Sequence, residues 1–450
     1  MKDSTRKNLG FIAATFLILL ASFAFNLFGA STPETFRDFQ LDSESIVKST
    51  VICEVVNGRP VFKGLLVFVP DSTYWGSCNP EKIKPYASQF GLQAKAISIF
   101  APNNLSDLSR YFNLITVVFA ALTAAIFALF LWAVRREWGT ATALVTTFLL
   151  AMSPFLVNFA RNLFWSTFLL FAPFVLGFAF YPWFKEKKHL LWFYLAFGLL
   201  IALKSATGYE YLSSVVLSGF VPVLYFELKE KSPIAKLVKK FFVIVAFSAG
   251  GFGVALAAHV AVLASYLGSF SAVFQSVVDR AAIRMIGLAG NLDWPSYVLE
   301  LFKGTYPRVF DQIEYWLGFL GKTGESLHSG VSMGMISLLH YLLSPALTMP
   351  IYLKYPFDIL VGSVLFMILL VGIILWRLSL LSGFRQPRVR ALIAAVGFAF
   401  LASFSWAVVG YSHMLAHPHI NTIIFFIPFF PMAYVAIGLW LTGGLSRKVS

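Results

Sequence analysis

The sequence predicts an all-α protein that crosses a membrane about ten times. Of its 450 residues, 58% are hydrophobic and only 12% are charged, whereas roughly 25% of the residues of an ordinary soluble domain are charged. Apolar runs of the length that spans a bilayer recur along the whole chain. A single soluble domain would not bury this much apolar surface. The composition also excludes intrinsic disorder and, with two cysteines, a disulfide-dense secreted scaffold.

Ten apolar runs are expected to span the membrane as helices. They are 10–30, 111–134, 140–158, 163–184, 189–206, 209–227, 241–267, 356–376, 390–410 and 422–443. The first run lacks a clean cleavage site, so we interpret it as an anchor that is kept. The chain thus divides into a first span (1–30), extracytoplasmic loop 1 (31–110), six spans (111–267), a second extracytoplasmic loop (268–355) and three final spans (356–450).

The placement of lysine and arginine predicts that both termini are cytoplasmic. With that orientation the inner segments carry 19 of the 35 basic residues and 5 of the 21 acidic residues. The outer segments hold 16 of each kind, so the whole net charge of +14 lies inside, as the positive-inside rule requires. The basic charge is therefore explained without nucleic acid, and no nucleic-acid partner is expected.

The two long outer segments are expected to differ in structure. Loop 1 holds both Cys53 and Cys78, and disulfides persist in the oxidising compartment outside the cell membrane. We expect a small folded unit with one bridge, which would close a loop of about 26 residues and stabilise it by about 3 kcal/mol; two unpaired thiols are the alternative. Segment 268–355 alternates charged and apolar stretches, which is typical of helices lying on a membrane surface.

Acidic residues gather where the first predicted span leaves the membrane. Asp38 and Asp42 lie four residues apart and would share one face of a helix. The sequence Asp42-Ser-Glu44 is also typical of a helix start, where carboxylates face the positive end of the helix dipole. The pattern fits either first-turn carboxylates on a solvated helix or a general base held at the membrane surface. Asp38 is favoured as the base because Phe36 and Phe39 flank it.

Two short turns on the same side of the membrane carry further charges. Arg161 lies between the third and fourth spans in a strongly apolar run, where it either extends to water or binds phosphate. Lys204, Tyr209 and Glu210 surround Gly208 between the fifth and sixth spans. The lysine and the glutamate either pair with each other or contact a lipid head group. Tyrosines are common at the membrane–water interface, so Tyr209 has an ordinary explanation as well. Gly208 is expected to permit the tight reversal.

The last such turn contains His413, His417 and His419. No carboxylate or cysteine accompanies them locally, and Pro418 prevents a single helical face, so no metal site is expected. They either hold a phosphate or hydroxyl group or simply add polarity at the interface. All these groups belong to the outer layer and none lies near the middle of a span, which is where a secondary transporter concentrates its polar groups.

At this point the chain resembles the GT-C superfamily of integral membrane glycosyltransferases. The resemblance covers the plan of residues 1–450 and rests on Asp38 and Asp42-Ser-Glu44, on Ser153-Pro154 through Arg161-Asn162, and on Gly208-Tyr209-Glu210. It is nearest to bacterial members found with surface-polysaccharide genes. It implies a GT-C-like fold in the bacterial cytoplasmic membrane, with an active site on the periplasmic or extracellular face and a role in polysaccharide biosynthesis of the cell envelope.

The resemblance also implies an inverting sugar transfer from a polyprenyl-phosphate-linked donor to a glycan, lipid or protein acceptor. Asp38 would be the base, with Asp42 or Glu44 as the alternative. Arg161, Lys204 and His417 would neutralise the leaving phosphate, and charge stabilisation of this kind is usually the largest catalytic contribution. No cofactor and no metal are expected. The chain departs from many members because no acidic doublet follows its first span directly.

Two other functions remain open from the sequence. An O-antigen polymerase or ligase also joins lipid-linked sugars and usually relies on a late loop with arginines and histidines. The segment 268–355 offers such residues, namely Arg280, Arg284, His328 and His340. A transporter or flippase of a lipid-linked intermediate would need a polar path across the bilayer, for which the span 241–267 offers only His259.

Overall fold

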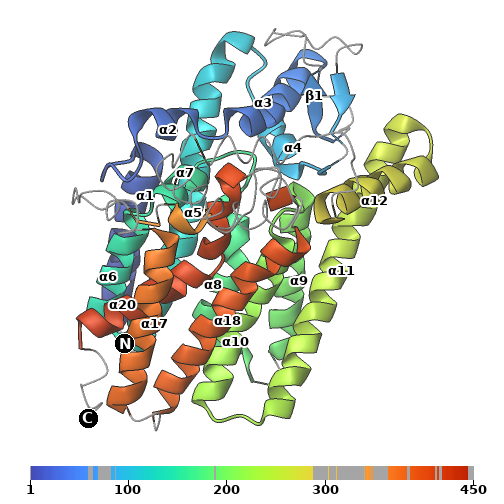
Figure 1. Cartoon of the computed structure of the whole chain (residues 1–450). Coiled ribbons are helices and arrows are strands. Elements are labelled where there is room, and N and C mark those ends of the chain that lie inside the picture. Colours follow the sequence, from blue (N-terminus) through green and yellow to red (C-terminus); the bar gives the residue numbers. More distant parts are fainter. Residues whose placement is uncertain are drawn as a thin grey trace.

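The computed structural model shows a helical bundle with a small folded unit at one end (Figure 1). It describes residues 2–58, 64–68, 83–86, 88–186, 189–286, 303, 311, 339, 341–344, 346–347, 363–382, 386–410, 413–414 and 418–443. Among these residues, seven helices are long and apolar enough to cross a membrane, or eight if one bent pair counts as a span. The chain is thus a multi-pass helical membrane protein.

An apolar helix occupies each of the ten ranges that the sequence predicts. The long ones are α1 (Lys2–Phe25), α5 (Leu108–Trp138), α8 (Thr167–Phe184), α9 (Leu190–Thr207), α10 (Leu212–Lys229), α11 (Ile234–Leu267) and α18 (Pro387–Val409). The others are the bent pair α6 (Thr140–Ala151) and α7 (Pro154–Ala160), with the shorter apolar helices α17 (Val364–Ser382) and α20 (Phe429–Leu441).

Two of the predicted spans are interrupted, and proline is present at both breaks. The third is bent by 75° between α6 and α7, where Pro154 is the first residue of α7 and has no N–H to continue the preceding helix. The last does not begin as an α-helix at residue 422. A 3₁₀ stretch, η4 (Pro418–Phe426), precedes α20, and Pro428 caps α20. Long uninterrupted helices were the wrong expectation at both places.

Aromatic rings fill the centre of the bundle between α5 and α8. Phe127 contacts Phe171 with ring centroids 4.6 Å apart, and Phe130 contacts Phe174 at 5.2 Å. All four side chains are fully buried. Between helices that span a membrane, such ring contacts stabilise the fold through close van der Waals packing. Around this core α10 packs against α8 and α18, α9 against α11, and α1 against α5.

Loop 1 folds into the compact unit at the upper end of Figure 1. Its elements are α2 (Pro33–Asp38), α3 (Leu41–Val56), β1 (Leu66–Phe68), β2 (Ile83–Pro85), α4 (Leu92–Ile99) and η2 (Leu105–Asp107). The strands pair antiparallel, with Leu66 opposite Pro85, so the class is helical apart from this small sheet. Cys53 is buried in α3 and Cys78 lies outside the described residues, so the bridge stays a prediction.

The second long segment between predicted spans (268–355) is described mainly through α12 (Phe270–Ile286), which follows α11. Valines of α12 pack against α11, and Val273 is fully buried there. His328 and His340 lie outside the described residues, as do the side chains of Arg280 and Arg284. The structure therefore leaves the polymerase hypothesis, which depends on these groups, as a prediction.

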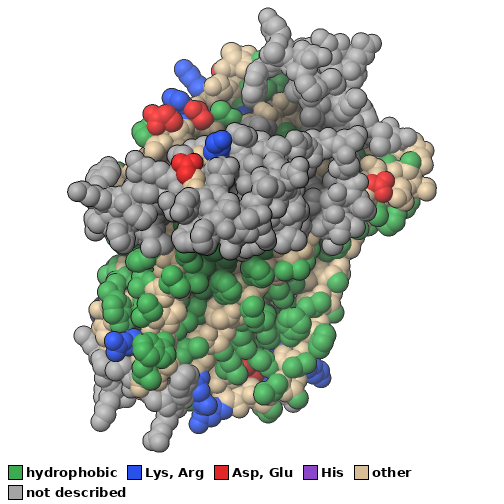
Figure 2. Space-filling view, in the orientation of Figure 1, with side chains coloured by type: hydrophobic (Ala, Val, Ile, Leu, Met, Phe, Trp, Pro, Cys, Tyr) green, Lys and Arg blue, Asp and Glu red, His purple; other side chains and the backbone are tan. Residues whose placement is uncertain are grey.

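Several lysine and arginine side chains lie at the end of the bundle opposite loop 1. Figure 2 shows lysine and arginine side chains at the lower end of the visible face. At that end the Arg136 guanidinium donates to the carbonyl groups of Phe178 and Ala179 at 3.1 Å. The Glu227 carboxylate of α10 lies 2.5 Å from the Lys240 amino group of α11. The Tyr181 hydroxyl of α8 donates a hydrogen bond to the same carboxylate at 2.7 Å. This end is thus held by a buried ion-pair network.

Candidate functional site

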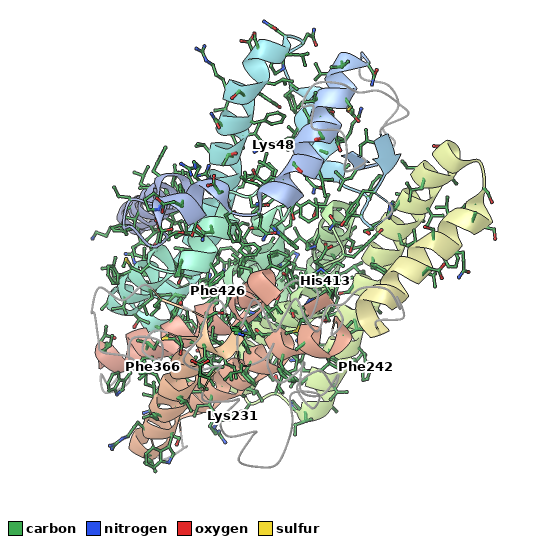
Figure 3. The ribbon with its side chains drawn as sticks, turned by 45° about the horizontal axis from the view of Figure 1, so that its top comes forward. Lys48, Lys231, Phe242, Phe366, His413 and Phe426 are labelled. Carbon is green, nitrogen blue, oxygen red and sulfur yellow. The ribbon has the colours of Figure 1, made fainter. Side chains whose placement is uncertain are left out.

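Buried polar side chains form one layer where loop 1 meets the ends of the helices. We call this set the polar layer: each member is at most 9% exposed, and they come from loop 1, the α7–α8 turn, the α9–α10 turn and the end of α18. The members are Glu44, Gln89, Asn162, Trp165, Ser166, Lys204, Glu210, Tyr211, Trp406 and His413. His413 is buried, and in Figure 3 it lies at a level between Lys48 of loop 1 and Lys231 at the opposite end.

Of the three predicted acidic residues, Asp38 lies outside the polar layer. It ends α2, its side chain is 44% exposed, and Arg37 pairs with it at 2.9 Å. The hydrogen bond from Arg37 holds the pKa of the Asp38 carboxyl below its usual value. Gln40 adopts the left-handed conformation (φ 56°) and separates α2 from α3. Asp38 and Asp42 therefore lie on different helices, and the predicted shared face is wrong; the Asp42 side chain is outside the described residues.

Glu44 is the acidic residue of loop 1 that reaches the α7–α8 turn. It lies in the first turn of α3, as the helix-start pattern predicts. Its Oε1 accepts the backbone N–H of Leu163 at 3.2 Å, and its Oε2 lies 2.8 Å from the Lys48 amino group. Both contacts stabilise negative charge on the carboxylate.

Arg161 lies beside Glu44 at the end of α7. Its guanidinium stacks over the Phe36 ring, 4.3 Å from the ring centroid. Burial lowers the pKa of Arg161, and the charge of Glu44 opposes that shift. Phe39 packs on Phe159 of α7 at 4.9 Å. The two phenylalanines thus attach the α2 segment to this turn instead of burying Asp38.

The α7–α8 turn is held by its own polar groups. The Asn162 side-chain oxygen accepts the backbone N–H groups of Phe164 and Trp165, at 3.0 and 3.2 Å. Gln93 of α4 donates to the Phe164 carbonyl at 2.9 Å. Ser166, the N-cap of α8, is fully buried in the left-handed conformation (φ 46°). Such backbone strain is concentrated at functional sites in proteins.

The α9–α10 turn brings Lys204 and Glu210 together with loop 1. The Lys204 amino group donates to the Gly208 carbonyl, and Gln89 donates to Glu210 Oε1 at 2.5 Å. A Cβ on Gly208 would lie 2.8 Å from Glu210 Oε2 and 3.0 Å from Gln89 Oε1. Gly208 is thus required for this close approach, whereas Tyr211 (φ 60°) adopts the left-handed conformation at the reversal. The expectation that Gly208 permits the tight reversal agrees with this close approach, although the left-handed residue of the reversal is Tyr211.

Tyr209 points from the same turn to α11. Its hydroxyl lies 2.9 Å from Nδ1 of His259, which is fully buried beside the Phe90 ring. Burial and the charge of Glu210 raise the pKa of the Tyr209 hydroxyl above its ordinary value. Tyr209 is therefore a neutral hydrogen-bonding group near Glu210, and it ties α11 to the polar layer.

Aromatic side chains connect the two turns to the end of α18. The Tyr211 ring lies between Trp165 and Trp406, with centroids 5.4 and 5.5 Å away. Trp406 contacts His413 at 5.8 Å. The structure thus brings His413 into the site with Lys204 and Glu210, while His417 lies outside the described residues.

Several buried polar atoms of this region have no hydrogen-bond partner within the described residues. They include Trp165 Nε1, Ser166 Oγ, Ser205 Oγ and Trp406 Nε1. Buried polar groups in proteins are almost always paired, and leaving one unpaired costs about 1–3 kcal/mol. Within the described residues these atoms are therefore available to bond a polar ligand.

Neither a metal centre nor a known relative accounts for this layer. Among the described residues, no group of three or more histidine, cysteine, aspartate or glutamate side chains is placed to hold a metal ion. Searches of protein families, of curated proteins and of solved structures give no match to the chain. The function must therefore be inferred from the geometry of the polar layer.

Sequence reasoning missed Gln89, Trp165, Trp406 and Lys48. Trp165 follows Arg161 closely in the same apolar turn, so its proximity in sequence was a usable signal. Gln89 and Trp406 lie in segments where no motif marks them, and only tertiary contact brings them to the turns. Lys48 follows Glu44 by one helical turn, which is the spacing of an ion pair on a helix.

Proposed function

We propose that this chain is a membrane glycosyltransferase that moves a sugar from a polyprenyl-phosphate-linked donor to a glycan, lipid or protein acceptor. The observation that supports it best is the polar layer, where buried carboxylates, a buried lysine and unpartnered hydrogen-bond donors meet at one end of a membrane bundle. A lipid-linked sugar has the matching parts: an anionic phosphate, hydroxyl groups and an apolar chain. In the proposed orientation this end faces the outside of the bacterial cytoplasmic membrane.

Glu44 is the stronger candidate for the general base. It is buried against the α7–α8 turn, whereas Asp38 is exposed and paired with Arg37. Glu44 would take the proton of the acceptor hydroxyl while the acceptor oxygen bonds to C1 of the donor sugar. The bond between C1 and the phosphate oxygen breaks, and its electron pair leaves with polyprenyl phosphate. Attack opposite the leaving group inverts the anomeric centre.

Arg161 and Lys204 are the proposed partners of the leaving phosphate. Both are cationic side chains at turns of the polar layer, and the guanidinium presents several donors in one plane. The first residues of α8 and α10 lie at the same turns, and the positive end of a helix dipole also favours an anion. His413 or His417 would add a further donor. These groups stabilise charge that grows as the phosphate leaves.

The aromatic group of the polar layer suits the sugar. The Trp165 and Trp406 rings offer apolar faces, and their unpartnered N–H groups can donate to hydroxyl groups of a pyranose. Tyr211 contacts both indoles and so links them within the layer. Glu210, fixed by Gln89, is a hydrogen-bond acceptor beside them.

A comparison of surface glycans with and without the gene tests this function. We expect the mass of surface glycans, or of glycosylated surface proteins, to fall by a single sugar when the gene is deleted. The loss of chain length with single repeats left behind would instead favour an O-antigen polymerase or ligase. Unchanged glycans would contradict both activities and favour a transporter of a lipid-linked intermediate.

A further inference from the structure

A cavity of about 380 Å³ lies between α3 and the start of α5, adjacent to the polar layer. Its volume falls in the range of small-molecule sites, about 300–1,000 Å³. Seven residues of the described chain line it: Lys48, Ile52, Leu105, Leu108, Ser109, Phe112 and Asn113. None of the sequence motifs described above predicts it.

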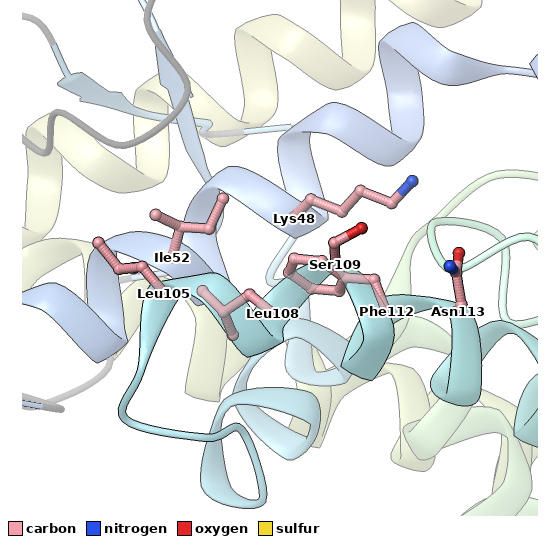
Figure 4. A pocket seen from close by; sticks show the side chains of 7 residues that line it. All are labelled: Lys48, Ile52, Leu105, Leu108, Ser109, Phe112 and Asn113. Atoms are coloured by element: carbon pink, nitrogen blue, oxygen red, sulfur yellow. The ribbon is translucent and has the colours of Figure 1, made fainter.

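The cavity has a polar end and an apolar end. Figure 4 shows the tips of Lys48, Ser109 and Asn113 gathered on one side and Ile52 with the leucines on the other. Among the lining residues that the structure describes, the charged one is Lys48 and none is acidic. An occupant with a negative group at one end and an apolar face at the other matches this arrangement.

Lys48 also links the cavity to Glu44, the proposed base. Its amino group lies 2.8 Å from Glu44 Oε2 and is one helical turn away on α3. An anion in the cavity would compete with Glu44 for this lysine. Occupancy would therefore weaken the ion pair of Glu44 at the moment when an acceptor is present.

We propose that this cavity binds the acceptor, and that the acceptor is an acidic saccharide. This inference rests on the proposed function. Lys48 pairs with the carboxylate of the saccharide, Ser109 and Asn113 bond its hydroxyl groups, and its apolar ring face lies on Leu108 and Phe112. The acceptor hydroxyl is then delivered next to Glu44, which loses Lys48 as its partner and takes the proton.

Ligand-observed NMR on the purified full chain in detergent tests the binding separately from catalysis. Glucuronate is the probe, glucose is its neutral counterpart, and acetate tests for the carboxylate alone. We expect glucuronate to give saturation transfer and glucose to give much less, with acetate displacing glucuronate only weakly. In the Lys48→Met variant binding should weaken roughly tenfold, as expected for the loss of a charge-assisted hydrogen bond.

Matched variants separate binding from folding. Lys95 is the matched lysine, because it also pairs with a buried glutamate of α3, Glu54, at 3.0 Å but does not line the cavity. The Lys95→Met variant should therefore bind glucuronate normally. Ser109→Trp should block the cavity at an exposed position of α5, whereas Arg110→Trp, the next residue along, should not. Equal binding of glucose and glucuronate, or full binding by Lys48→Met and Ser109→Trp, would overturn the proposal even if the glycan experiment supports a transferase.

Discussion

Gln89 of loop 1 donates a 2.5 Å hydrogen bond to Glu210, which lies 121 residues later between α9 and α10. Both side chains are almost fully buried. A buried carboxylate requires such partners, because an unpaired charge in a low-dielectric interior is strongly unfavourable. This one contact therefore fixes loop 1 over the α9–α10 turn and closes one side of the polar layer.

Replacing Gln89 by leucine should destabilise the protein and displace loop 1. Glu210 would lose the hydrogen bond from Gln89, and the loss of one partner of a buried hydrogen bond costs about 1–3 kcal/mol. Thermal unfolding of the purified protein measures this loss. Gln275→Leu is the matched control, because Gln275 donates to Asp279 in an exposed pair on α12, and its melting temperature should stay within experimental error. Equal stability of the two variants would argue against the docking role of Gln89.

Gly208→Ala should impair the site through one methyl group. The added Cβ would lie 2.8 Å from Glu210 Oε2, and the carboxylate must shift away from Gln89. The backbone of Gly208 is extended, so backbone strain does not add to the effect. We expect transfer to fall at least roughly tenfold, which corresponds to about 1.4 kcal/mol.

Gly10→Ala is the control for that substitution. Nothing lies within 4 Å of a Cβ at Gly10 in α1, and alanine favours a helix more than glycine does. This variant should keep full transfer activity. If Gly208→Ala were equally active, the close approach at Gly208 would not matter for function.

Arg161→Lys should lower transfer although the positive charge is kept. Lysine cannot reproduce the planar stack over Phe36 or offer several donors to one phosphate. We expect kcat/KM for the lipid-linked donor to fall by roughly ten- to a hundredfold, a loss of about 1.4–2.7 kcal/mol. Arg110→Lys, at an exposed position of α5, should leave the kinetics unchanged. Wild-type kinetics in Arg161→Lys would remove Arg161 from phosphate binding.

A Cys53–Cys78 bridge, if formed as predicted, should be visible in the intact mass. The oxidised chain would be lighter by two hydrogens and would not react with a thiol reagent after unfolding. Reduction should lower the free energy of unfolding by about 3 kcal/mol. A thiol-reactive chain under oxidising conditions would contradict the bridge.

Hydropathy predicted the helices well because burial in a membrane depends on composition over a long window. Each predicted span contains an apolar helix among the described residues, and seven helices, or eight with the bent pair, are long and apolar enough to cross a membrane. The interruptions near Pro154 and Pro428 were missed although proline was visible in the sequence. Proline breaks a helix only in some contexts, and neighbouring helices often compensate for it in membranes. The composition alone therefore could not identify the bent span.

The site was harder to predict because its members come from four distant segments. The sequence grouped Lys204, Glu210 and His413 at the ends of predicted spans, and the structure buries all three side chains. It ranked Asp38 above Glu44, since flanking aromatic residues suggested burial; instead, Phe36 stacks on Arg161 and Phe39 on Phe159. The break at Gln40 then turns Asp38 to the surface. Such a left-handed residue has no strong signal in sequence.

The most direct test of the central claim compares Glu44→Gln with Glu54→Gln. Both glutamates are buried in α3 and paired with a lysine, but Glu44 contacts the α7–α8 turn and Glu54 pairs with Lys95 of α4. Each variant would be expressed in cells that lack the gene, and the mass of the surface glycans would be measured by mass spectrometry. We expect Glu54→Gln to restore the missing sugar and Glu44→Gln, expressed at the same level in the membrane, to restore none. Restoration by both variants would contradict Glu44 as the general base.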